Sequence, residues 1–294
     1  MGAPSRASTG ECGVWDVTDP ALLRRNLVTR KGYSPDAFQL EAFDVVDAGK
    51  SVLVAAPTSS GKTLVAEYAI DRARALGRTV AYTTPIKALS NQKMRDLSGW
   101  LGVEHVGLLT GDNAVRPEAP VVVMTTEVLR NMIYAASPFL DNLGVVVLDE
   151  VHYLQDPYRG PVWEEVIIQL PPEIQLVCLS ATVSNARELA DWISEVRDGC
   201  DVVVEHQRPV ALHDHFLLYE KGSRSLREFR TVRDGRPNPE VERYLARSSG
   251  RQANGEYRRR GGTRPGRPRR LEVIRHLEER SRLPAIVFIF SRQG

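Results

Sequence analysis

The chain has 294 residues, 42% of them hydrophobic and 26% charged, with a formal net charge of +2. This is the ordinary composition of a globular protein of about two domains. No apolar run approaches the ~20 residues of a membrane-spanning helix, and the N-terminus lacks the apolar core of a signal peptide. Three widely spaced cysteines exclude a disulfide scaffold and a paired-cysteine metal site. We therefore expect a cytoplasmic protein with no membrane partner.

The charge is unevenly distributed along the chain. Residues 1–220 carry 19 Lys and Arg against 29 Asp and Glu, whereas residues 221–294 carry 20 against 8. Fifteen arginines fall in residues 224–270, which contain five acidic residues. Such a block is either a disordered arm that binds nucleic acid by counterion release or a solvated insertion without a partner. We favour the nucleic-acid arm.

Short apolar runs alternate with helical patterns up to about residue 218. In chain order, the sequence predicts a helix at 21–27, a strand at 51–55, a helix at 62–75, a strand at 79–83, a helix at 87–97, a strand at 120–125, a helix at 127–134, a strand at 144–148, a helix at 162–170, a strand at 175–179, a helix at 185–193, and strands at 202–204 and 210–218. This alternation favours an α/β fold in which helices cover both faces of a parallel sheet.

The pattern then changes. Residues 221–270 are rich in Gly, Pro and Arg and have few aliphatic side chains, so we expect no regular structure there. Helical periodicity returns at 271–280, and an apolar strand is expected at 285–290.

A phosphate-binding loop is the strongest chemical signal. It comprises Ala56, Pro57, Thr58, Ser59, Ser60, Gly61, Lys62 and Thr63, between an expected strand and an expected helix. In that setting backbone N–H groups and the helix dipole bind phosphate, Lys62 contacts the β- and γ-phosphates, and Thr63 ligates Mg²⁺. Ala56 stands where the pattern normally has Gly, and the alternative is a chance Gly-Lys-Thr at a turn.

A carboxylate pair follows the apolar run 144–148. Asp149 and Glu150 would lie at the carboxyl edge of the sheet, where α/β proteins bind ligands. Asp149 can hold Mg²⁺ and Glu150 can orient the attacking water in phosphoryl transfer. Taken alone, the pair could equally be a helix cap. Combined with the phosphate loop, it favours a nucleotide site.

These motifs, in this order, resemble the superfamily 2 helicases, and Asp149-Glu150-Val151-His152 resembles their DExH-box branch. Phe38-Gln39, Thr84–Gln92, Thr110–Asp112, Thr125–Arg130, Ser180–Thr182 and Ala285–Arg292 resemble further helicase motifs. Arg159-Gly160 followed by Trp163-Glu164-Glu165 resembles the Ski-like group and bacterial HelY-type helicases. The resemblance covers residues 33 to about 218 and resumes at Ala285.

The resemblance implies roles for matching residues. His152 joins Lys62, Asp149 and Glu150 in the catalytic set, Gln39 would read adenine through its amide, and Ser180 and Thr182 would couple nucleotide state to strand binding. Contact with a nucleic-acid backbone is implied for Thr84, Pro85, Lys87, Gly111, Thr125, Thr126 and Arg130. From the residues alone, Thr and Pro after a strand could be turn formers, exposed cations could be merely solvated, and Thr182 could be a helix N-cap.

Other conspicuous residues are interpreted as structural. His213 and His215 lie two apart without a visible cluster of metal ligands, so we expect structural histidines. Trp163, Trp192 and Cys178 fall at apolar positions and are expected in the core.

The resemblance thus implies an N-terminal segment (1–32), a RecA-like P-loop NTPase domain (33–220), a basic insertion (221–270) and the beginning of a second RecA-like domain (271–294). The implied function is an ATP- and Mg²⁺-dependent helicase that translocates on single-stranded nucleic acid, with RNA favoured over DNA. Alternatives are a nucleotide-gated binding module without unwinding activity and a P-loop kinase. Since the family uses arginines of a complete second domain, we expect this chain to bind nucleotide but to show weak or absent polynucleotide-stimulated hydrolysis and unwinding. The sequence leaves the oligomeric state open.

Overall fold

The computed structural model describes residues 18–181, 185–197, 199–220, 225–233, 235–248, 265–266 and 268–289. The chain divides into two compact units, residues 1–210 and residues 211–294. Within the described residues, none of the helices is both long enough and apolar enough to cross a membrane.

The first unit contains a sheet of eight strands in the order β4-β3-β5-β2-β6-β7-β1-β8, all parallel except β4. The strands are β1 (Ser51–Ala55), β2 (Thr79–Thr84), β3 (Val106–Thr110), β4 (Asn113–Val115), β5 (Val121–Thr125), β6 (Leu143–Leu148), β7 (Gln175–Ser180) and β8 (Cys200–Val204). The helices are α1 (Pro20–Lys31), α2 (Ala37–Asp47), α3 (Thr63–Ala75), α4 (Lys87–Leu101), α5 (Thr126–Tyr134), α6 (Gly160–Gln169) and α7 (Ala186–Arg197), with short 3₁₀ helices η1 (Val103–His105), η2 (Pro138–Asn142) and η3 (Val151–Gln155).

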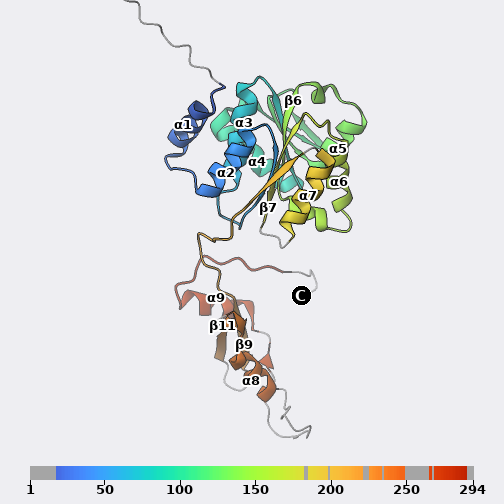
Figure 1. The fold of residues 1–294 in the computed structure, drawn as a ribbon. Coiled ribbons are helices and arrows are strands. Elements are labelled where there is room, and N and C mark those ends of the chain that lie inside the picture. Colours follow the sequence, from blue (N-terminus) through green and yellow to red (C-terminus); the bar gives the residue numbers. More distant parts are fainter. Residues whose placement is uncertain are drawn as a thin grey trace, which may run out of the picture. The chain divides into compact units, whose positions relative to one another are not determined.

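Helices cover both faces of this sheet, as the sequence predicts (Figure 1). Side chains alternate along β1, so Val52 and Val54 join one core while Leu53 and Ala55 join the other. The first core includes side chains of α1 to α4, and the second those of α5 to α7. The architecture is therefore the expected RecA-like α/β fold.

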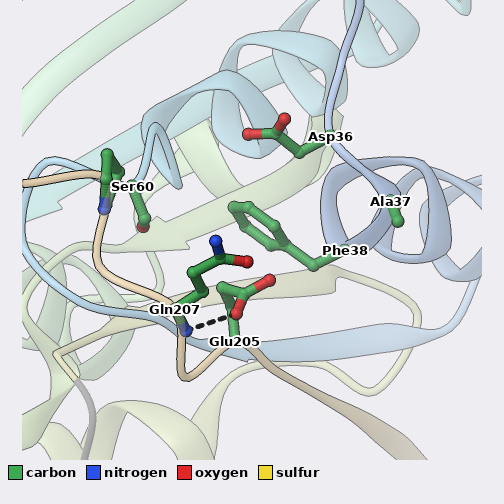
Figure 2. A pocket seen from close by; sticks show the side chains of 7 residues that line it. Asp36, Ala37, Phe38, Ser60, Glu205 and Gln207 are labelled. Atoms are coloured by element: carbon green, nitrogen blue, oxygen red, sulfur yellow. Dashed lines mark hydrogen bonds between the residues drawn. The ribbon is translucent and has the colours of Figure 1, made fainter.

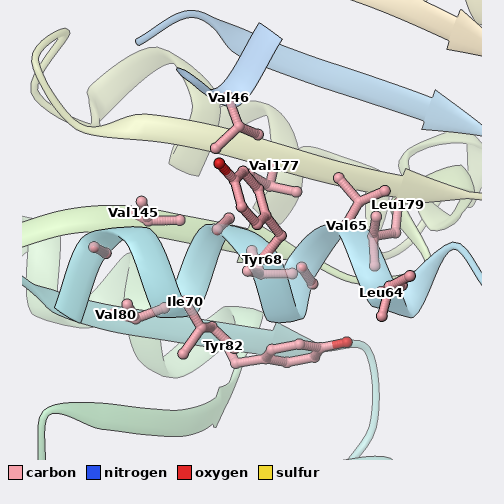
Figure 3. Packing of buried hydrophobic residues seen from close by; sticks show 14 of the residues in the cluster. Val46, Leu64, Val65, Tyr68, Ile70, Val80, Tyr82, Val145, Val177 and Leu179 are labelled. Atoms are coloured by element: carbon pink, nitrogen blue, oxygen red, sulfur yellow. The ribbon is translucent and has the colours of Figure 1, made fainter. Parts of the chain in front are cut away.

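The first core is built around α3. Its Tyr68 and Ile70 pack on strand residues such as Val145 and Val177 (Figure 3). The Tyr68 ring stacks on Phe43 of α2 with centroids 4.3 Å apart. Since α3 begins at the phosphate loop, this packing fixes the loop against the sheet.

The second unit contains helices and strands within residues 221–270, where the composition predicts no regular structure. Strand β9 (His215–Glu220) pairs antiparallel with β10 (Ser225–Arg230) and with β13 (Pro265–Gly266). Its other elements are β11 (Val232–Arg233), β12 (Arg236–Pro237), α8 (Pro239–Ser248) and α9 (Arg270–Glu278). The prediction of no regular structure is therefore wrong for β10 and α8; residues 249–264 lie outside the described part.

Local capping explains why α8 forms in a polar segment. Asn238 accepts a hydrogen bond from the Glu240 N–H at 3.0 Å and donates to the Arg230 carbonyl at 2.8 Å. Asn at the N-cap with Pro at the first helical position is a strong start signal. Phe229 and Tyr244 then pack with ring centroids 5.3 Å apart. These contacts join α8 to β10.

Two expected strands differ from the structure. The strand expected at 210–218 begins at His215, since residues 211–214 have no regular structure. The strand expected at 285–290 is absent from the described residues 285–289. A strand needs a partner for its N–H and C=O groups, and no described strand pairs with this segment.

Candidate active site

The phosphate loop turns sharply between β1 and α3. Gly61 has φ +83°, and a Cβ there would lie 2.8 Å from Nε2 of Gln39, so this position requires glycine. Ala56 is fully buried, and its N–H donates to the Ser180 carbonyl at 3.2 Å. Because Ala56 has no positive φ, alanine fits the place that glycine normally takes.

The Asp149 carboxylate lies at the carboxyl end of β6 and is held on both oxygens. Oδ1 accepts the Glu150 N–H at 3.0 Å, and Oδ2 accepts the Tyr82 hydroxyl at 2.8 Å. Burial, reinforced by the charge of Asp149, raises the pKa of Tyr82 well above its usual value, so the hydroxyl stays protonated as a donor. Nζ of Lys93 lies 3.8 Å from the same Oδ2.

The next residue has unusual backbone geometry. Glu150 has φ 56° and ψ 42°, the left-handed region that residues with a side chain rarely adopt. Its Oε2 lies 3.3 Å from Nδ1 of His152. Such strain persists where the surrounding structure enforces it and is common at functional sites. The sharp turn places Glu150 beside Asp149 instead of continuing the strand.

One cavity of about 390 Å³ brings the two predicted motifs together. Its lining residues are Thr58, Ser59, Gly61, Lys62, Thr63, Leu89, Gln92, Lys93, Asp149 and Glu150. Lys62 is 9% exposed, and the buried Ser60 hydroxyl has no hydrogen-bond partner within the described structure. A buried cation at the start of a helix suits a phosphate group. The Thr63 hydroxyl and Asp149 carboxylate supply oxygen ligands of the kind Mg²⁺ prefers.

A second cavity of about 340 Å³ flanks the other side of the loop, since it includes Ser60. Figure 2 shows the Phe38 ring pointing toward Glu205 and Gln207. The residues that line this cavity are Asp36, Ala37, Phe38, Ser60, Glu205, Gln207 and Pro209. An aromatic ring, a proline and polar side chains suit a planar base.

Gln39 does not line either cavity. Its Oε1 accepts the Asp36 N–H at 2.8 Å and its Nε2 donates to the Gly61 carbonyl at 3.0 Å. The amide therefore connects α2 to the phosphate loop. To read adenine as expected, Gln39 would have to give up one of these bonds.

The residues expected to contact nucleic acid gather at the same carboxyl edge, on neighbouring strands. Thr84 of β2 and Thr125 of β5 are direct register partners, and β3, which ends just before Gly111, pairs with the other side of β5. Strand β2 also pairs with β6, and the Asp149 N–H donates to the Thr83 carbonyl at 3.1 Å. The nucleotide site and this edge are thus adjacent.

Exposure divides these seven residues. Lys87 and Gly111 are exposed, and Thr125 and Arg130 are half-buried. Thr84, Pro85 and Thr126 are buried. The Thr84 hydroxyl is already hydrogen-bonded to the Ser90 hydroxyl at 2.7 Å, so its side chain is not open to a ligand in this structure. We call Lys87, Gly111, Thr125 and Arg130 the strand edge.

Of the two coupling residues, Ser180 lies at the end of β7 and is fully buried, and its hydroxyl has no partner in the described part of the chain. Thr182 lies outside the described residues. His215 is structural as expected, because its Nδ1 lies 2.6 Å from Glu228 in the second unit. Trp163 and Cys178 are fully buried in the second core.

Sequence reasoning missed several residues at the site. Tyr82 and Lys93 meet Asp149 from β2 and α4, and Glu205, Gln207 and Pro209 reach the base-sized cavity from the end of β8. The polar Tyr82 within an apolar strand was a usable signal. The contribution of 205–209 depends on β8 pairing beside β1 and has no local signal.

Comparison with known proteins gives consistent similarities. The DEAD/DEAH box helicase family model matches residues 36–190. The chain is 52% identical over 270 residues to the "Probable helicase HelY" of Mycobacterium tuberculosis, covering 89% of this chain and 30% of that protein. It is 42% identical to human Superkiller complex protein 2, covering 88% of this chain and 22% of the relative.

A solved structure is also similar. The Mycobacterium smegmatis helicase Lhr, bound to single-stranded DNA and AMP-PNP, superposes with TM-score 0.53 and 28% identity, covering 64% of this chain and 28% of that one. The chain thus spans less than a third of each of these proteins.

Proposed function

This chain belongs to the DEAD/DEAH box helicase family, and from that premise we propose that it binds ATP at the carboxyl edge of its sheet and couples hydrolysis to movement on single-stranded nucleic acid. The observation that carries this proposal is a cavity that both Lys62 and Asp149 line. It unites a cation for phosphate with a carboxylate for the metal, beside the strand edge.

We assign the base of ATP to the cavity beside Phe38 and its phosphates to the cavity beside Lys62. Backbone N–H groups at the start of α3 and the Lys62 ammonium hold the phosphates. Mg²⁺, held by Thr63 and Asp149, would neutralise charge on the β- and γ-phosphates.

Glu150 is our proposed water-positioning residue. Glu150 lines the phosphate cavity, and its carboxylate can accept a proton from the attacking water. His152 lies 3.3 Å from that carboxylate and is placed to hold its orientation. Tyr82 donates to Oδ2 of Asp149, whereas the Glu150 N–H donates to Oδ1 of the same carboxylate.

We infer that single-stranded RNA is favoured over DNA, since the curated relatives include an Arabidopsis thaliana protein named as an ATP-dependent RNA helicase, 40% identical over 311 residues. Lys87 and Arg130 of the strand edge supply cations for the backbone, and Gly111 is exposed and allows close approach. Such contacts are independent of base sequence.

Steady-state ATP turnover with no polynucleotide, with oligo(U) and with oligo(dT) tests the proposal. We expect turnover by this chain to be slow, and to rise more with oligo(U) than with oligo(dT). Turnover indifferent to both, together with phosphorylation of a small molecule, would support a kinase instead. Nucleotide-dependent RNA binding without strand displacement would support the binding-module alternative.

A further inference from the structure

The segment after Asp149-Glu150 contacts Pro85, two residues before Lys87 of the strand edge, and Arg130 of the strand edge. Neither contact takes part in the proposed chemistry. We call residues 151–165 the link segment; it comprises η3 and the first part of α6. It begins at the nucleotide site, because Val151 directly follows Glu150. It contains Arg159-Gly160 and Trp163-Glu164-Glu165, which the proposed mechanism leaves unused.

The first contact is made by Arg159. Its Nη1 donates to the Pro85 carbonyl at 3.0 Å. Pro85 lies between β2, which ends at Thr84, and α4, which begins at Lys87 of the strand edge. The bond therefore holds the turn that carries Lys87.

The second contact is made by Glu165. Its Oε2 lies 3.7 Å from Nε of Arg130, also of the strand edge. Both side chains are about a third exposed, so this ion pair is screened, and at 3.7 Å it is longer than the 3.0 Å hydrogen bond of Arg159. The link segment thus touches the turn after β2 and helix α5, which directly follows β5.

Packing makes the link segment a rigid unit. The Asp156 carboxylate accepts the Arg159 N–H at 3.0 Å, and the Gly160 N–H donates to the Asp156 carbonyl at 2.7 Å. A Cβ at Gly160 would lie 2.1 Å from the Leu154 carbonyl oxygen, so this close turn requires glycine. The buried Trp163 ring stacks on Tyr153 with centroids 6.1 Å apart.

The start of the link segment is connected to the nucleotide site by more than sequence. His152 contacts Glu150 and packs against Tyr153, with ring centroids 5.3 Å apart. A rotation of Glu150 out of its left-handed backbone conformation would move η3, and through Tyr153 and Trp163 it would move α6.

We propose that the link segment couples the nucleotide site to the strand edge, with Arg159 as the main positioning residue and Glu165 as the second. This inference rests on the proposed function. Coupling would then involve the link segment in addition to Ser180 at the end of β7. Arg159 acts through the Pro85 carbonyl and does not line the phosphate cavity.

Anisotropy of fluorescein-labelled U12 tests this, with the full chain, without nucleotide and with Mg²⁺ and AMP-PNP. The readout is the coupling factor, the ratio of the two RNA dissociation constants. We expect at least about fivefold in wild type, in the usual range of allosteric coupling. Arg159→Ala should reduce it to below about twofold, while the affinity for AMP-PNP without RNA stays within about twofold.

Three further variants separate coupling from general damage. Arg159→Lys keeps a donor for the Pro85 carbonyl and should recover much of the factor. Glu165→Gln should reduce it less than Arg159→Ala, because its ion pair is screened. Arg25→Ala is the matched control: Arg25 is exposed on α1, and its side chain has no hydrogen bond or ion pair to any described residue. Should Arg159→Ala fail to fold by circular dichroism, Arg159→Lys and Glu165→Gln carry the test.

The outcomes are distinct. Wild type that binds U12 equally with and without AMP-PNP overturns the inference, as does Arg159→Ala with the wild-type coupling factor. An equal loss of AMP-PNP affinity and RNA affinity also overturns it, because that indicates a purely structural role. Wild type that binds no U12 in either state overturns the proposed function itself.

Discussion

The hydroxyl of Tyr82 donates to Oδ2 of Asp149 across 2.8 Å, and so joins strand β2 to the metal-binding carboxylate at the end of β6. Tyr82 is fully buried, and Lys93 lies over its ring with Nζ 5.1 Å from the centroid. The strand that leads to Thr84 therefore also orients the carboxylate of the nucleotide site.

Tyr82→Phe is expected to lower ATP turnover about five- to tenfold, because it removes one hydrogen bond of about 1 kcal/mol that orients Asp149. Nucleotide affinity should change less than about twofold, because Lys62 is intact. Steady-state kinetics measure both. The control is Tyr68→Phe. Tyr68 is also fully buried and also donates to an aspartate, since its hydroxyl lies 2.7 Å from Asp47, but this pair is outside the nucleotide site. Equal decreases in the two variants would contradict the role of Tyr82.

Arg197 is expected to be a main stabilising residue of the first unit. Its 5%-exposed side chain donates to the carbonyls of Leu170 and Ile174 at 2.6 Å and of Pro171 at 2.8 Å. Arg197→Met would leave these acceptors unpaired and should cost about 3 kcal/mol. Urea unfolding followed by tryptophan fluorescence measures this, with the exposed Arg187→Met on the same helix as control. A destabilisation below about 0.5 kcal/mol for Arg197→Met would show that water replaces the bonds.

Glu228 is expected to make the stability of the second unit depend on pH. Burial would raise its pKa, but hydrogen bonds from Arg282 and His276 outweigh this and lower the pKa from its usual 4.5 to about 2. Because the folded pKa is lower than the unfolded one, the stabilisation is complete above pH 4.5 and disappears as pH falls toward 2. Hydrogen exchange in β9 and β10 measures it.

The comparison is between wild type and Glu228→Gln at the same pH, so that the intrinsic dependence of exchange on pH cancels. At pH 6 the variant should exchange faster, and at pH 3 the difference should be smaller. A difference that stays constant over this range would mean that the Glu228 charge contributes nothing.

The tract 251–264 is expected to add salt-sensitive binding to nucleic acid, because it carries five arginines and one acidic residue. Deleting this tract should reduce the slope of log affinity against log salt by about 0.7 for each phosphate that the tract neutralises on a single strand. The folded elements β10 and α8 remain intact in this deletion. An unchanged slope would leave the tract as a solvated insertion.

The RecA-like fold was predictable because strands buried on both faces have an unmistakable apolar run, as in β6, and because each is followed by a helical period. Helix α2 and strands β3 and β4 were missed, since β3 contains Gly107 and β4 is short and largely exposed. Helix α8 was missed because Arg and Pro in its segment concealed the Asn238 cap. The segment 285–289 has the composition of a strand but no described partner to pair with.

The phosphate loop and the carboxylate pair were predictable because each has a local pattern tied to a strand end. The partners that orient them were not, because the hydrogen bond of Tyr82 to Asp149 spans 67 positions and depends on the pairing of β2 with β6. The burial of individual motif residues could not be predicted from the sequence either. Thr84 matches a helicase motif, yet its hydroxyl is hydrogen-bonded to Ser90 inside the unit.

Equilibrium titration with a fluorescent ATP analogue tests whether Lys62 and Asp149 form one Mg²⁺-ATP site. Lys62→Ala removes a charge-assisted interaction of about 1.5–3 kcal/mol and should weaken binding roughly ten- to hundredfold. Asp149→Asn should abolish most of the gain in affinity that Mg²⁺ gives wild type. Equal affinity in wild type and Lys62→Ala, with the Mg²⁺ dependence unchanged in Asp149→Asn, would contradict the account.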